Sequence, residues 1–221
     1  MDKKNLRACI FDLDGVIVDT AKYHYQAWKK LCNGLGFDLL EAENEKLKGV
    51  SRTESLDLIL ALGGVSLSAE EKLHWADQKN EWYLEYIEHI DSSEILPGVL
   101  LFLYSLKKEN IKIGLGSASK NAVKILKKIE LYDLFDVVVD GNMTTKSKPD
   151  PEVFLKGAEL LGYESNEIVV FEDAEKGIEA AIAGGFRAVG VGQADILPDA
   201  HWVISSFENQ TIEGIIRHLT K

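Results

Sequence analysis

The stretch ACIFDLDGVIVDT, residues 8–20, places two aspartates directly after a short apolar run. The run from Ala8 to Phe11 is predicted to be a buried β-strand, and Asp12 and Asp14 follow where the chain leaves the sheet. Two carboxylates held this close repel each other unless a cation or a shared proton offsets their charge. A magnesium ion, which prefers oxygen ligands, therefore suits the end of this strand.

Further apolar runs predict the other strands of the same sheet. They end at Asp, Gly or Ser and cover residues 111–115, 137–139, 168–171 and 188–191. Between them, apolar residues at spacings of three and four predict amphipathic helices, as in Val99, Phe102, Leu103 and Leu106, or Val123, Leu126 and Ile129. This alternation predicts a doubly wound α/β fold, with helices on both faces of a parallel sheet.

The segment that follows the first strand, up to about residue 92, has helical periodicity and no convincing strand. Its apolar positions are Tyr23, Trp28, Leu31, Leu56, Ile59, Leu60, Leu73, Trp82, Tyr83 and Ile87. We therefore predict a helical cap domain, residues 19–93, inserted into an α/β core domain formed by residues 1–18 and 94–221. Ligands of doubly wound sheets bind beyond the carboxyl ends of the strands, so residues at those ends are the first candidates for a site.

A second acidic pair, Glu172 and Asp173, closes the run at residues 168–171. Because parallel strands end at the same edge of a sheet, up to four carboxylates could converge there, with Asp12 and Asp14 as the other two. An alternative is that each pair caps the helix after it, since an aspartate in that position accepts backbone N–H bonds. For either pair taken alone, both interpretations stay open.

Two other strand ends carry groups suited to phosphate. Ser117, Ala118 and Ser119 offer hydroxyl and backbone donors at an expected helix start, where anions bind well. Lys146 and Lys148 follow the third strand, and either lysine could be an ordinary solvated charge. Together with the carboxylates, these groups indicate phosphoryl transfer, in which an aspartate attacks phosphorus, a cation and a lysine neutralise the phosphate oxygens, and a second acid moves a proton.

The composition limits the class of partner and the compartment. A net charge of −11 over 221 residues disfavours nucleic acid, whose phosphates the surface as a whole would repel. Asp12 interrupts the N-terminal apolar run, which argues against a signal peptide, and no stretch has the length of a transmembrane helix. Cys9 and Cys32 lack the spacing of a metal or redox site and are interpreted as buried thiols. We expect a cytoplasmic monomer that binds no membrane.

Four ordered motifs, DLDGVIVDT (12–20), SAS (117–119), KPDP (148–151) and FEDAEKGI (171–178), resemble the haloacid dehalogenase superfamily over the whole chain. The resemblance implies that Asp12 is the nucleophile and a magnesium ligand. It implies that Asp14 is the general acid/base and binds the metal through its backbone carbonyl. The other implied residues are the metal ligands Glu172 and Asp173, and Ser117, the Ala118 N–H and Lys148 at the transferring phosphate. Dehalogenases of this superfamily use neither the second aspartate nor magnesium, so Asp14 favours phosphate chemistry.

Within the superfamily, DTAKYHYQAWK (19–29), LKGVSR (47–52) and SASKN (117–121) resemble the β-phosphoglucomutase family. That family interconverts β-glucose 1-phosphate and glucose 6-phosphate through β-glucose 1,6-bisphosphate, which also activates the enzyme. The resemblance implies that Arg52, Lys120 and Asn121 hold the phosphate that is not transferred. It also implies that Thr20 lies at the hinge of the cap, and that His24 with Lys79 couples closure of the cap to the placement of Asp14. Together with these three residues, the implied substrate contacts are Trp28, Lys48, Gly49, Val50 and Ser119.

Each of these residues also has a plainer interpretation. His24 could be a satisfied histidine of the cap, Trp28 a core residue of the cap, and Arg52 a solvated first-turn residue of a helix capped by Ser51. Ala174 stands where many relatives have serine, which removes a hydroxyl from beside the metal site. The alternatives to a mutase are a magnesium-dependent sugar-phosphate phosphatase, with water as acceptor, and a non-catalytic sugar-phosphate-binding protein.

Overall fold

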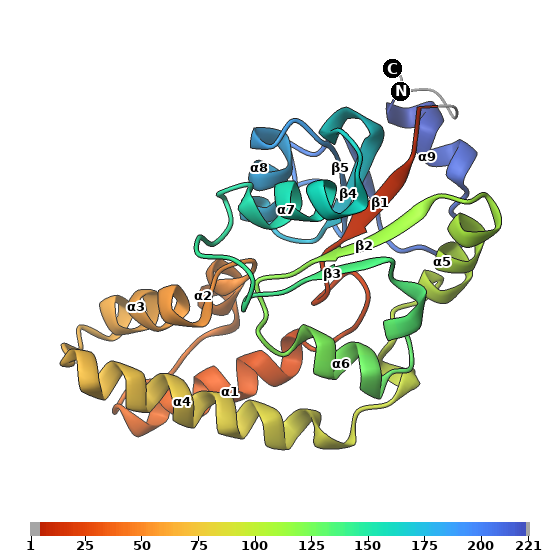
Figure 1. Cartoon of the computed structure of the whole chain (residues 1–221). Coiled ribbons are helices and arrows are strands. Elements are labelled where there is room, and N and C mark those ends of the chain that lie inside the picture. The colour runs from red at the N-terminus through yellow and green to blue at the C-terminus, as the bar shows by residue number, and fades with distance from the viewer. Residues whose placement is uncertain (1–4, 220–221) are drawn as a thin grey trace.

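A computed structural model describes residues 5–219, so the first four and last two residues of the expected core domain lie outside it. Within the described range the strands form one parallel sheet in the order β3-β2-β1-β4-β5-β6 (Figure 1). The strands are β1 (Ala8–Phe11), β2 (Lys112–Gly116), β3 (Val137–Val139), β4 (Ile168–Glu172), β5 (Arg187–Val191) and β6 (Trp202–Ile204). The predicted parallel α/β sheet is confirmed. The sequence did not predict β6, a run of three residues of which two are only half-buried.

The helices alternate with these strands along the second half of the chain and are contiguous in the first. Their bounds are α1 (Ala21–Gly34), α2 (Glu41–Asn44), α3 (Arg52–Gly63), α4 (Ala69–Tyr86), α5 (Val99–Lys108), α6 (Ala122–Lys128), α7 (Glu152–Leu161), α8 (Glu175–Ala183) and α9 (Ile212–Leu219). Short 3₁₀ turns join them at Glu45–Leu47, Ile87–His89, Ser92–Glu94, Tyr132–Leu134 and Ser165–Glu167.

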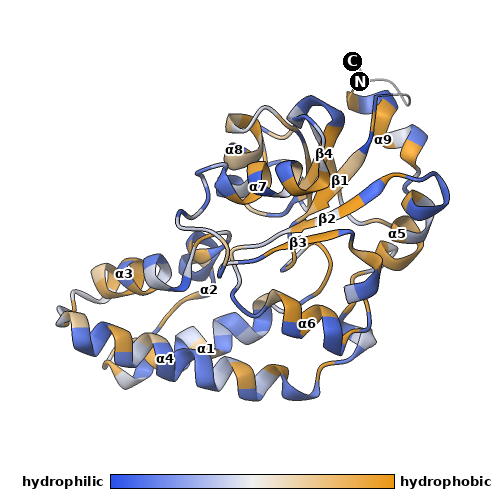
Figure 2. Ribbon diagram, in the orientation of Figure 1, coloured by the Kyte–Doolittle hydropathy of each residue, from blue (hydrophilic) through white to orange (hydrophobic). Residues whose placement is uncertain are grey.

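The two faces of the sheet are buried under different helices because side chains alternate along each strand. In β1, Cys9 and Phe11 point into the cluster formed with α5, α6 and α9, whereas Ala8 and Ile10 point into the cluster formed with α7 and α8. The Phe11 ring stacks on Phe171 of β4 at 4.8 Å between centroids. β1, which lies inside the sheet, is buried and apolar along its whole length and is orange in Figure 2, whereas β2 begins with the exposed Lys112.

The four helices α1 to α4, here called the helical layer, lie beside the carboxyl ends of the strands (Figure 1). Helices α1, α3 and α4 share an apolar cluster that includes Trp28, Leu31, Leu56 and Ile59, whereas α2 has no buried residue. Ser51 accepts a hydrogen bond from the Glu54 N–H and so caps α3, as its position predicts. Leu73 was expected among the apolar positions but is 68% exposed, because it lies on the outer face of α4.

The two connections between the sheet and the helical layer run side by side. The Asp19 N–H donates to the Glu94 carbonyl at 3.0 Å, and the Leu96 N–H donates to the Ile17 carbonyl at 3.0 Å. Val18 and Ile95 form an isolated antiparallel bridge between these bonds. The chain therefore leaves the sheet and returns to it through one short pair of extended segments.

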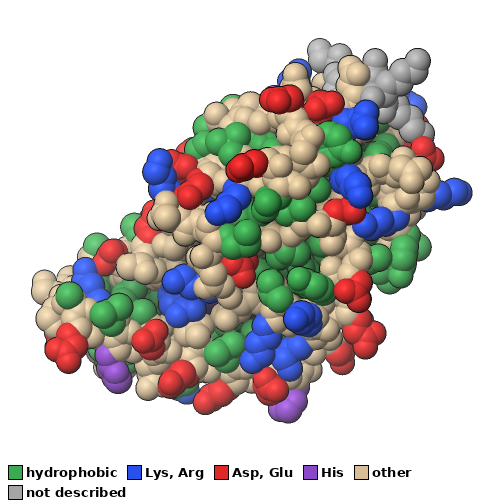
Figure 3. All heavy atoms as spheres, in the orientation of Figure 1, with side chains coloured by type: hydrophobic (Ala, Val, Ile, Leu, Met, Phe, Trp, Pro, Cys, Tyr) green, Lys and Arg blue, Asp and Glu red, His purple; other side chains and the backbone are tan. Residues whose placement is uncertain are grey.

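The surface carries charges of both signs. Acidic and basic side chains intermingle over the face shown in Figure 3, with apolar side chains exposed between them. Cys9 and Cys32 are buried free thiols, as expected. Among residues 5–219, the structure contains no helix that combines the length and the apolar character needed to cross a bilayer.

Candidate active site

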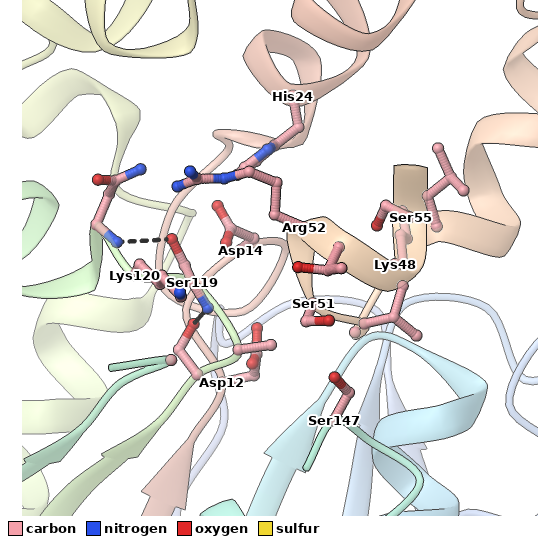
Figure 4. Close-up of a pocket in the computed structure, with 18 of the residues that line it drawn as sticks. Asp12, Asp14, His24, Lys48, Ser51, Arg52, Ser55, Ser119, Lys120 and Ser147 are labelled. Atoms are coloured by element: carbon pink, nitrogen blue, oxygen red, sulfur yellow. Dashed lines mark hydrogen bonds between the residues drawn. The ribbon is translucent and has the colours of Figure 1, made fainter. Parts of the chain in front are cut away.

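A cavity of about 340 Å³ lies between the carboxyl ends of the strands and the helical layer (Figure 4). The sheet side contributes Asp12, Asp14, Asp173 and the turn at residues 117–121, and the helical layer contributes residues of α1, α3 and α4. The strand ends and the helical segment that the sequence singled out therefore meet at one place.

Asp12 lies at the floor of this cavity and is bound by a buried lysine. Its carboxylate accepts a hydrogen bond from Lys148 Nζ at 2.5 Å, and the Lys148 side chain has no exposed surface. Burial alone would lower the pKa of Lys148, but the Asp12 and Glu172 carboxylates raise it. Lys146 also lines the cavity, but it is 67% exposed and pairs with Asp150, so Lys148 is the one of the two lysines that contacts Asp12.

Three carboxylates converge next to Asp12. Oxygen atoms of Asp12, Glu172 and Asp173 all lie within 4.8 Å of one another. Burial and the Asp12 charge raise the pKa of Glu172, and burial with the charges of Asp12 and Asp14 raises that of Asp173 to about 7, although Lys48 opposes the latter shift. Burial is the largest cause of both shifts, so the ionised forms of these two carboxyl groups are costly here without a further cation.

The donor set fits a magnesium ion. Glu172 Oε1 is buried and has no hydrogen-bond partner among the described residues, which is costly for an ionised oxygen unless a cation takes that place. All groups at the position are hard oxygen donors, which Mg²⁺ prefers. Gly177 of α8 leaves the room that Glu172 needs, because a Cβ atom there would lie 1.7 Å from Oε1.

Asp14 stands apart from this group of three carboxylates. Its side chain accepts a hydrogen bond from the Thr20 hydroxyl at the start of the helical layer. Burial and the Asp12 charge raise the pKa of Asp14 to about 6, against the effect of Thr20 and Lys79. A carboxyl group that titrates near neutrality is suited to exchange protons with a substrate oxygen. The structure thus brings together three of the four acids that could have converged, with Asp14 beside them.

Gly15 permits the close approach of the two acidic strand ends. Its φ of +80° is a conformation that residues with a Cβ rarely adopt. A Cβ atom at this position would lie 2.2 Å from Asp173 Oδ2. The glycine after Asp14 is therefore required both by the backbone turn and by the packing of Asp173.

The serine turn lies ahead of helix α6 and is not part of it. The Ser119 N–H donates to Ser117 Oγ at 3.1 Å, and the Asn121 N–H donates to Ser119 Oγ at 3.2 Å, as the dashed lines of Figure 4 show. The expectation that a helix starts at Ser117 is wrong, since these side-chain bonds hold a turn and α6 begins only at Ala122. Ser117 is buried at the floor of the cavity, whereas Lys120 is exposed at its edge.

His24 and Lys79 form a contact between α1 and α4. Lys79 Nζ lies 2.8 Å from His24 Nδ1 and 4.4 Å from the centre of the Trp28 ring, and only 2% of Lys79 is exposed. Burial, Lys79 and Arg52 lower the pKa of His24. Burial and Arg52 also lower the pKa of Lys79, although Asp14 opposes this. Trp28 belongs to the apolar cluster of the helical layer and also lines the cavity.

Arg52 points from the first turn of α3 into the cavity (Figure 4). Its guanidinium donates to Asn80 Oδ1 at 2.7 Å, and Asn121 Nδ2 donates to the same oxygen at 3.0 Å. The sequence analysis did not single out Asn80, because one asparagine on a polar helix carries no signal of its own. Its only hint was the neighbouring Lys79.

The segment before α3 closes the remaining side of the cavity. Lys48 Nζ lies 3.4 Å from Asp173 Oδ2, so the helical layer contacts the acidic group directly. Gly49, with φ of +73°, and the buried Val50 line the cavity beside it. Ala174 is buried at the start of α8 and provides no side-chain cap, in keeping with the missing hydroxyl.

Comparison with known proteins identifies the family of this chain. The model of the haloacid dehalogenase-like hydrolase family matches residues 9–191. A β-phosphoglucomutase from Bacillus subtilis is 42% identical over 210 residues, which are 94% of this chain and 93% of that protein. A fructose-1-phosphate phosphatase from Escherichia coli is 32% identical over 182 residues, 82% of this chain and 94% of that protein.

A solved structure shows the same fold. The crystal structure of a β-phosphoglucomutase from Clostridium difficile has a TM-score of 0.94 and 43% sequence identity, and the match covers 97% of each chain. The family match spans the sheet strands β1 to β5 and both acidic strand ends described above. The chain therefore belongs to the haloacid dehalogenase-like hydrolase family.

Proposed function

We propose that this protein is a β-phosphoglucomutase, an isomerase that interconverts β-D-glucose 1-phosphate and glucose 6-phosphate. The observation that carries the proposal is that cationic and hydrogen-bond-donating groups lie at two ends of one cavity. Asp12, Lys148 and Ser117 lie at the floor, whereas Arg52 and Asn121 face the same cavity near the helical layer. A substrate with two phosphates could bind both ends at once. The similarity to the β-phosphoglucomutases of B. subtilis and C. difficile supports the same activity.

The first half-reaction forms a bisphosphate. Phospho-Asp12 donates its phosphoryl group to a free hydroxyl of a bound glucose monophosphate, and Asp14 takes the proton of that hydroxyl. The new P–O bond to the sugar forms as the P–O bond to Asp12 breaks, which gives β-glucose 1,6-bisphosphate and a free Asp12 carboxylate. Lys148 neutralises charge on the transferring group because its ammonium lies 2.5 Å from Asp12.

The second half-reaction runs the same chemistry in reverse after the bisphosphate has turned over. Asp12 attacks the other phosphate, and Asp14 returns its proton to the sugar oxygen that leaves. The bisphosphate can also charge a free Asp12, so we propose that it acts as activator as well as intermediate. Asp12, Glu172, Asp173 and the Asp14 carbonyl would hold the magnesium ion, which supplies positive charge to the phosphate oxygens when bound.

We propose that residues 19–93 act as a cap domain that excludes water during transfer. The Lys48–Asp173 contact at 3.4 Å links this segment to the acidic group, and the Thr20 hydroxyl links it to Asp14. The His24–Lys79 pair lies behind these contacts and would couple cap position to Asp14, since the charge of Lys79 acts on Asp14. Exclusion of water favours transfer to a sugar over hydrolysis.

We further propose that the partner is a small phosphorylated sugar and that the enzyme is a cytoplasmic monomer with no nucleic-acid or membrane partner. The cavity of about 340 Å³ accommodates a sugar phosphate and not a polymer. The net charge of −11 disfavours nucleic acid. The buried free thiols Cys9 and Cys32 agree with a reducing compartment.

A coupled assay tests the proposed function. β-Glucose 1-phosphate is supplied with Mg²⁺ and a trace of β-glucose 1,6-bisphosphate, and glucose 6-phosphate and free phosphate are followed together. We expect glucose 6-phosphate to form with little free phosphate, and no product from Asp12→Asn. Stoichiometric free phosphate without the isomer would identify a phosphatase, the activity of the E. coli relative. Binding of sugar phosphates without any turnover would identify a binding protein.

A further inference from the structure

The carboxamide oxygen of Asn80 accepts two hydrogen bonds at the end of the cavity opposite Asp12. It accepts a hydrogen bond from Arg52 Nη2 at 2.7 Å and another from Asn121 Nδ2 at 3.0 Å. Arg52 begins α3 and Asn121 belongs to the serine turn of the sheet side, while Asn80 lies on α4. One oxygen therefore joins two donors from opposite sides of the cavity.

These two bonds leave much of the donor capacity of the cavity free. An amide oxygen has two lone pairs, so Asn80 Oδ1 is saturated by Arg52 and Asn121. A guanidinium has five N–H donors and a carboxamide has two, so both partners retain N–H groups for an anion. Asn80 fixes their orientation without occupying all of their donors.

Asn80 also leaves the charge of Arg52 available. The nearest carboxylate that pairs with Arg52 is Asp77, at 3.9 Å, and its side chain is 79% exposed, so it offsets the guanidinium charge only weakly. Asn80 itself is neutral. A carboxylate in its place would accept the same hydrogen bonds but would neutralise Arg52 and repel a phosphate.

We propose that Asn80 is a positioning residue that aligns Arg52 and Asn121 for the phosphomonoester that is not being transferred. This inference rests on the proposed function, because it assigns a role at the end of the cavity opposite Asp12. Asn80 makes no contact with the phosphate in this role. It raises affinity by preorganising two donors that otherwise must be ordered when the substrate binds.

The first test is Asn80→Ala, which keeps α4 intact because alanine favours helices. We expect KM for β-glucose 1-phosphate to rise about tenfold, with a smaller change in kcat, since two hydrogen bonds that orient the donors are lost. Glu54→Gln is the matched control. It removes the charge from the 3.3 Å ion pair between Glu54 of α3 and Lys176 of α8, and so also weakens a contact between the helical layer and the core, but it leaves the Arg52–Asn80 hydrogen bond in place. Its KM is expected to stay within twofold of the native value.

The second test separates positioning from simple packing. Asn80→Asp keeps an acceptor oxygen of the same size but adds a negative charge beside Arg52. We expect its KM to exceed that of Asn80→Ala at low ionic strength, and the excess to shrink as salt screens the charge. A packing role would give Asn80→Asp nearly native kinetics without dependence on salt. That outcome, or an unchanged or lowered KM in Asn80→Ala, would overturn the proposal.

Direct binding separates this inference from the proposed function. Glucose 6-phosphate is titrated into the full chain by calorimetry, which requires no turnover. If the native protein binds it but forms no isomer, the mutase assignment fails, and about tenfold weaker binding by Asn80→Ala still supports the role of Asn80. If the native protein isomerises its substrate and Asn80→Ala binds glucose 6-phosphate as tightly as the native protein, the role of Asn80 is refuted and the mutase stands.

Discussion

At the scale of single residues, Asp12 and Asp14 belong to one short motif but differ in the groups that surround their carboxylates. Asp12 is paired with Lys148 at 2.5 Å and lies in the group with Glu172 and Asp173. Asp14 is outside that group, and burial and the charge of Asp12 raise its pKa to about 6. One carboxylate is thus suited to attack phosphorus as an anion and the other to carry a proton.

The role of Asp14 leads to a first prediction. Asp14→Asn is expected to lower kcat by roughly 10²- to 10⁴-fold, because the asparagine cannot take up or release the proton of the sugar oxygen. The amide oxygen can still accept the Thr20 hydrogen bond, so the thermal midpoint should stay near the native value. Steady-state kinetics and a thermal melt check both points.

The control for this variant lies on the same connection. Asp19→Asn removes a carboxylate whose side chain is 53% exposed and whose partner is Lys22. It should leave kcat close to native. A native kcat in Asp14→Asn would show that the proton moves through another group.

Some residues of the site could be predicted from the sequence and others could not. The motif order indicated Asp12, Asp14, Glu172 and Asp173, because carboxylates after buried strands are a local pattern. Composition and spacing left Lys146 and Lys148 as equal candidates and only the family resemblance singled out Lys148, because which lysine contacts Asp12 depends on how the chain turns after β3. Asn80 is a polar helix residue like its neighbours, and only the approach of Asn121 from another part of the chain gives it a role.

At the scale of elements, burial on both sides of the sheet made the strands easy to find. The run at residues 168–171 coincides with most of β4, because a strand covered on both faces is apolar throughout, and the run at residues 137–139 coincides with β3, whose three residues are all valine. β6 is, like β3, a three-residue strand at an edge of the sheet with two half-buried residues, and so short a run predicts a strand only weakly. The start of α6 was misplaced because serine side chains replace the first turn of a helix.

Helix α5 offers a matched pair of apolar residues for a second prediction. Phe102 is 3% exposed and packs edge-on against Phe11 and Phe171, whereas its neighbour Leu101 is 77% exposed. Phe102→Ala is expected to lower the free energy of unfolding by about 3–5 kcal/mol, and Leu101→Ala by less than about 0.5 kcal/mol. Urea unfolding measures both values. Equal losses would mean that α5 does not pack on the sheet through Phe102.

Asp136 connects α5, β2 and the segment before β3 and gives a third prediction. Its carboxylate accepts hydrogen bonds from Lys107 Nζ, Lys112 Nζ and the Ile113 N–H, each at 2.9 Å. Burial alone would raise its pKa, but these bonds lower it from 3.8 to about 2. Because the folded-state pKa lies below that of the unfolded chain, the stabilisation is present above the unfolded value and is lost as the pH falls toward 2.

Asp136→Asn should therefore be less stable than the native protein by about 1 kcal/mol at pH 7, a modest value because both lysines are partly in water. The difference should shrink between about pH 5 and pH 2. Urea unfolding at several pH values checks this dependence. A difference that stays constant over that range would place the effect in packing and not in charge.

At the scale of the whole molecule, the site exists only where two parts of the chain meet. The strand ends supply the proposed reacting and metal-binding groups, the helical layer supplies Arg52 and the His24–Lys79 pair, and the segment before α3 supplies Lys48. The order of motifs predicted this meeting, but the contacts that hold it, such as Lys48 to Asp173, depend on tertiary geometry.

Metal binding gives a fourth prediction, for the stability of the whole chain. Mg²⁺ at 100 times its dissociation constant should stabilise the native state by about 2.7 kcal/mol, since the unfolded chain has no preformed site. For a chain of this size the thermal midpoint should rise by roughly 5–10 °C. Chelation with EDTA should reverse the rise and abolish turnover.

The metal-site variant Asp173→Asn is the control for that measurement. It removes one of the three converging carboxylates and should reduce the magnesium-dependent rise. If Mg²⁺ raised the thermal midpoint of Asp173→Asn as much as that of the native protein, the ion would bind at another position.

The paired connections at Asp19–Glu94 and Ile17–Leu96 have a consequence for engineering. Because both ends of the helical segment are held together by backbone hydrogen bonds, we expect the sheet to tolerate changes in the length of chain between them. Doubling a flexible loop costs only about 0.6 kcal/mol in closure entropy. A helical segment from another protein can therefore be grafted at this junction. Such a graft would change substrate selectivity and leave the phosphoryl-transfer groups of the strand ends unaltered.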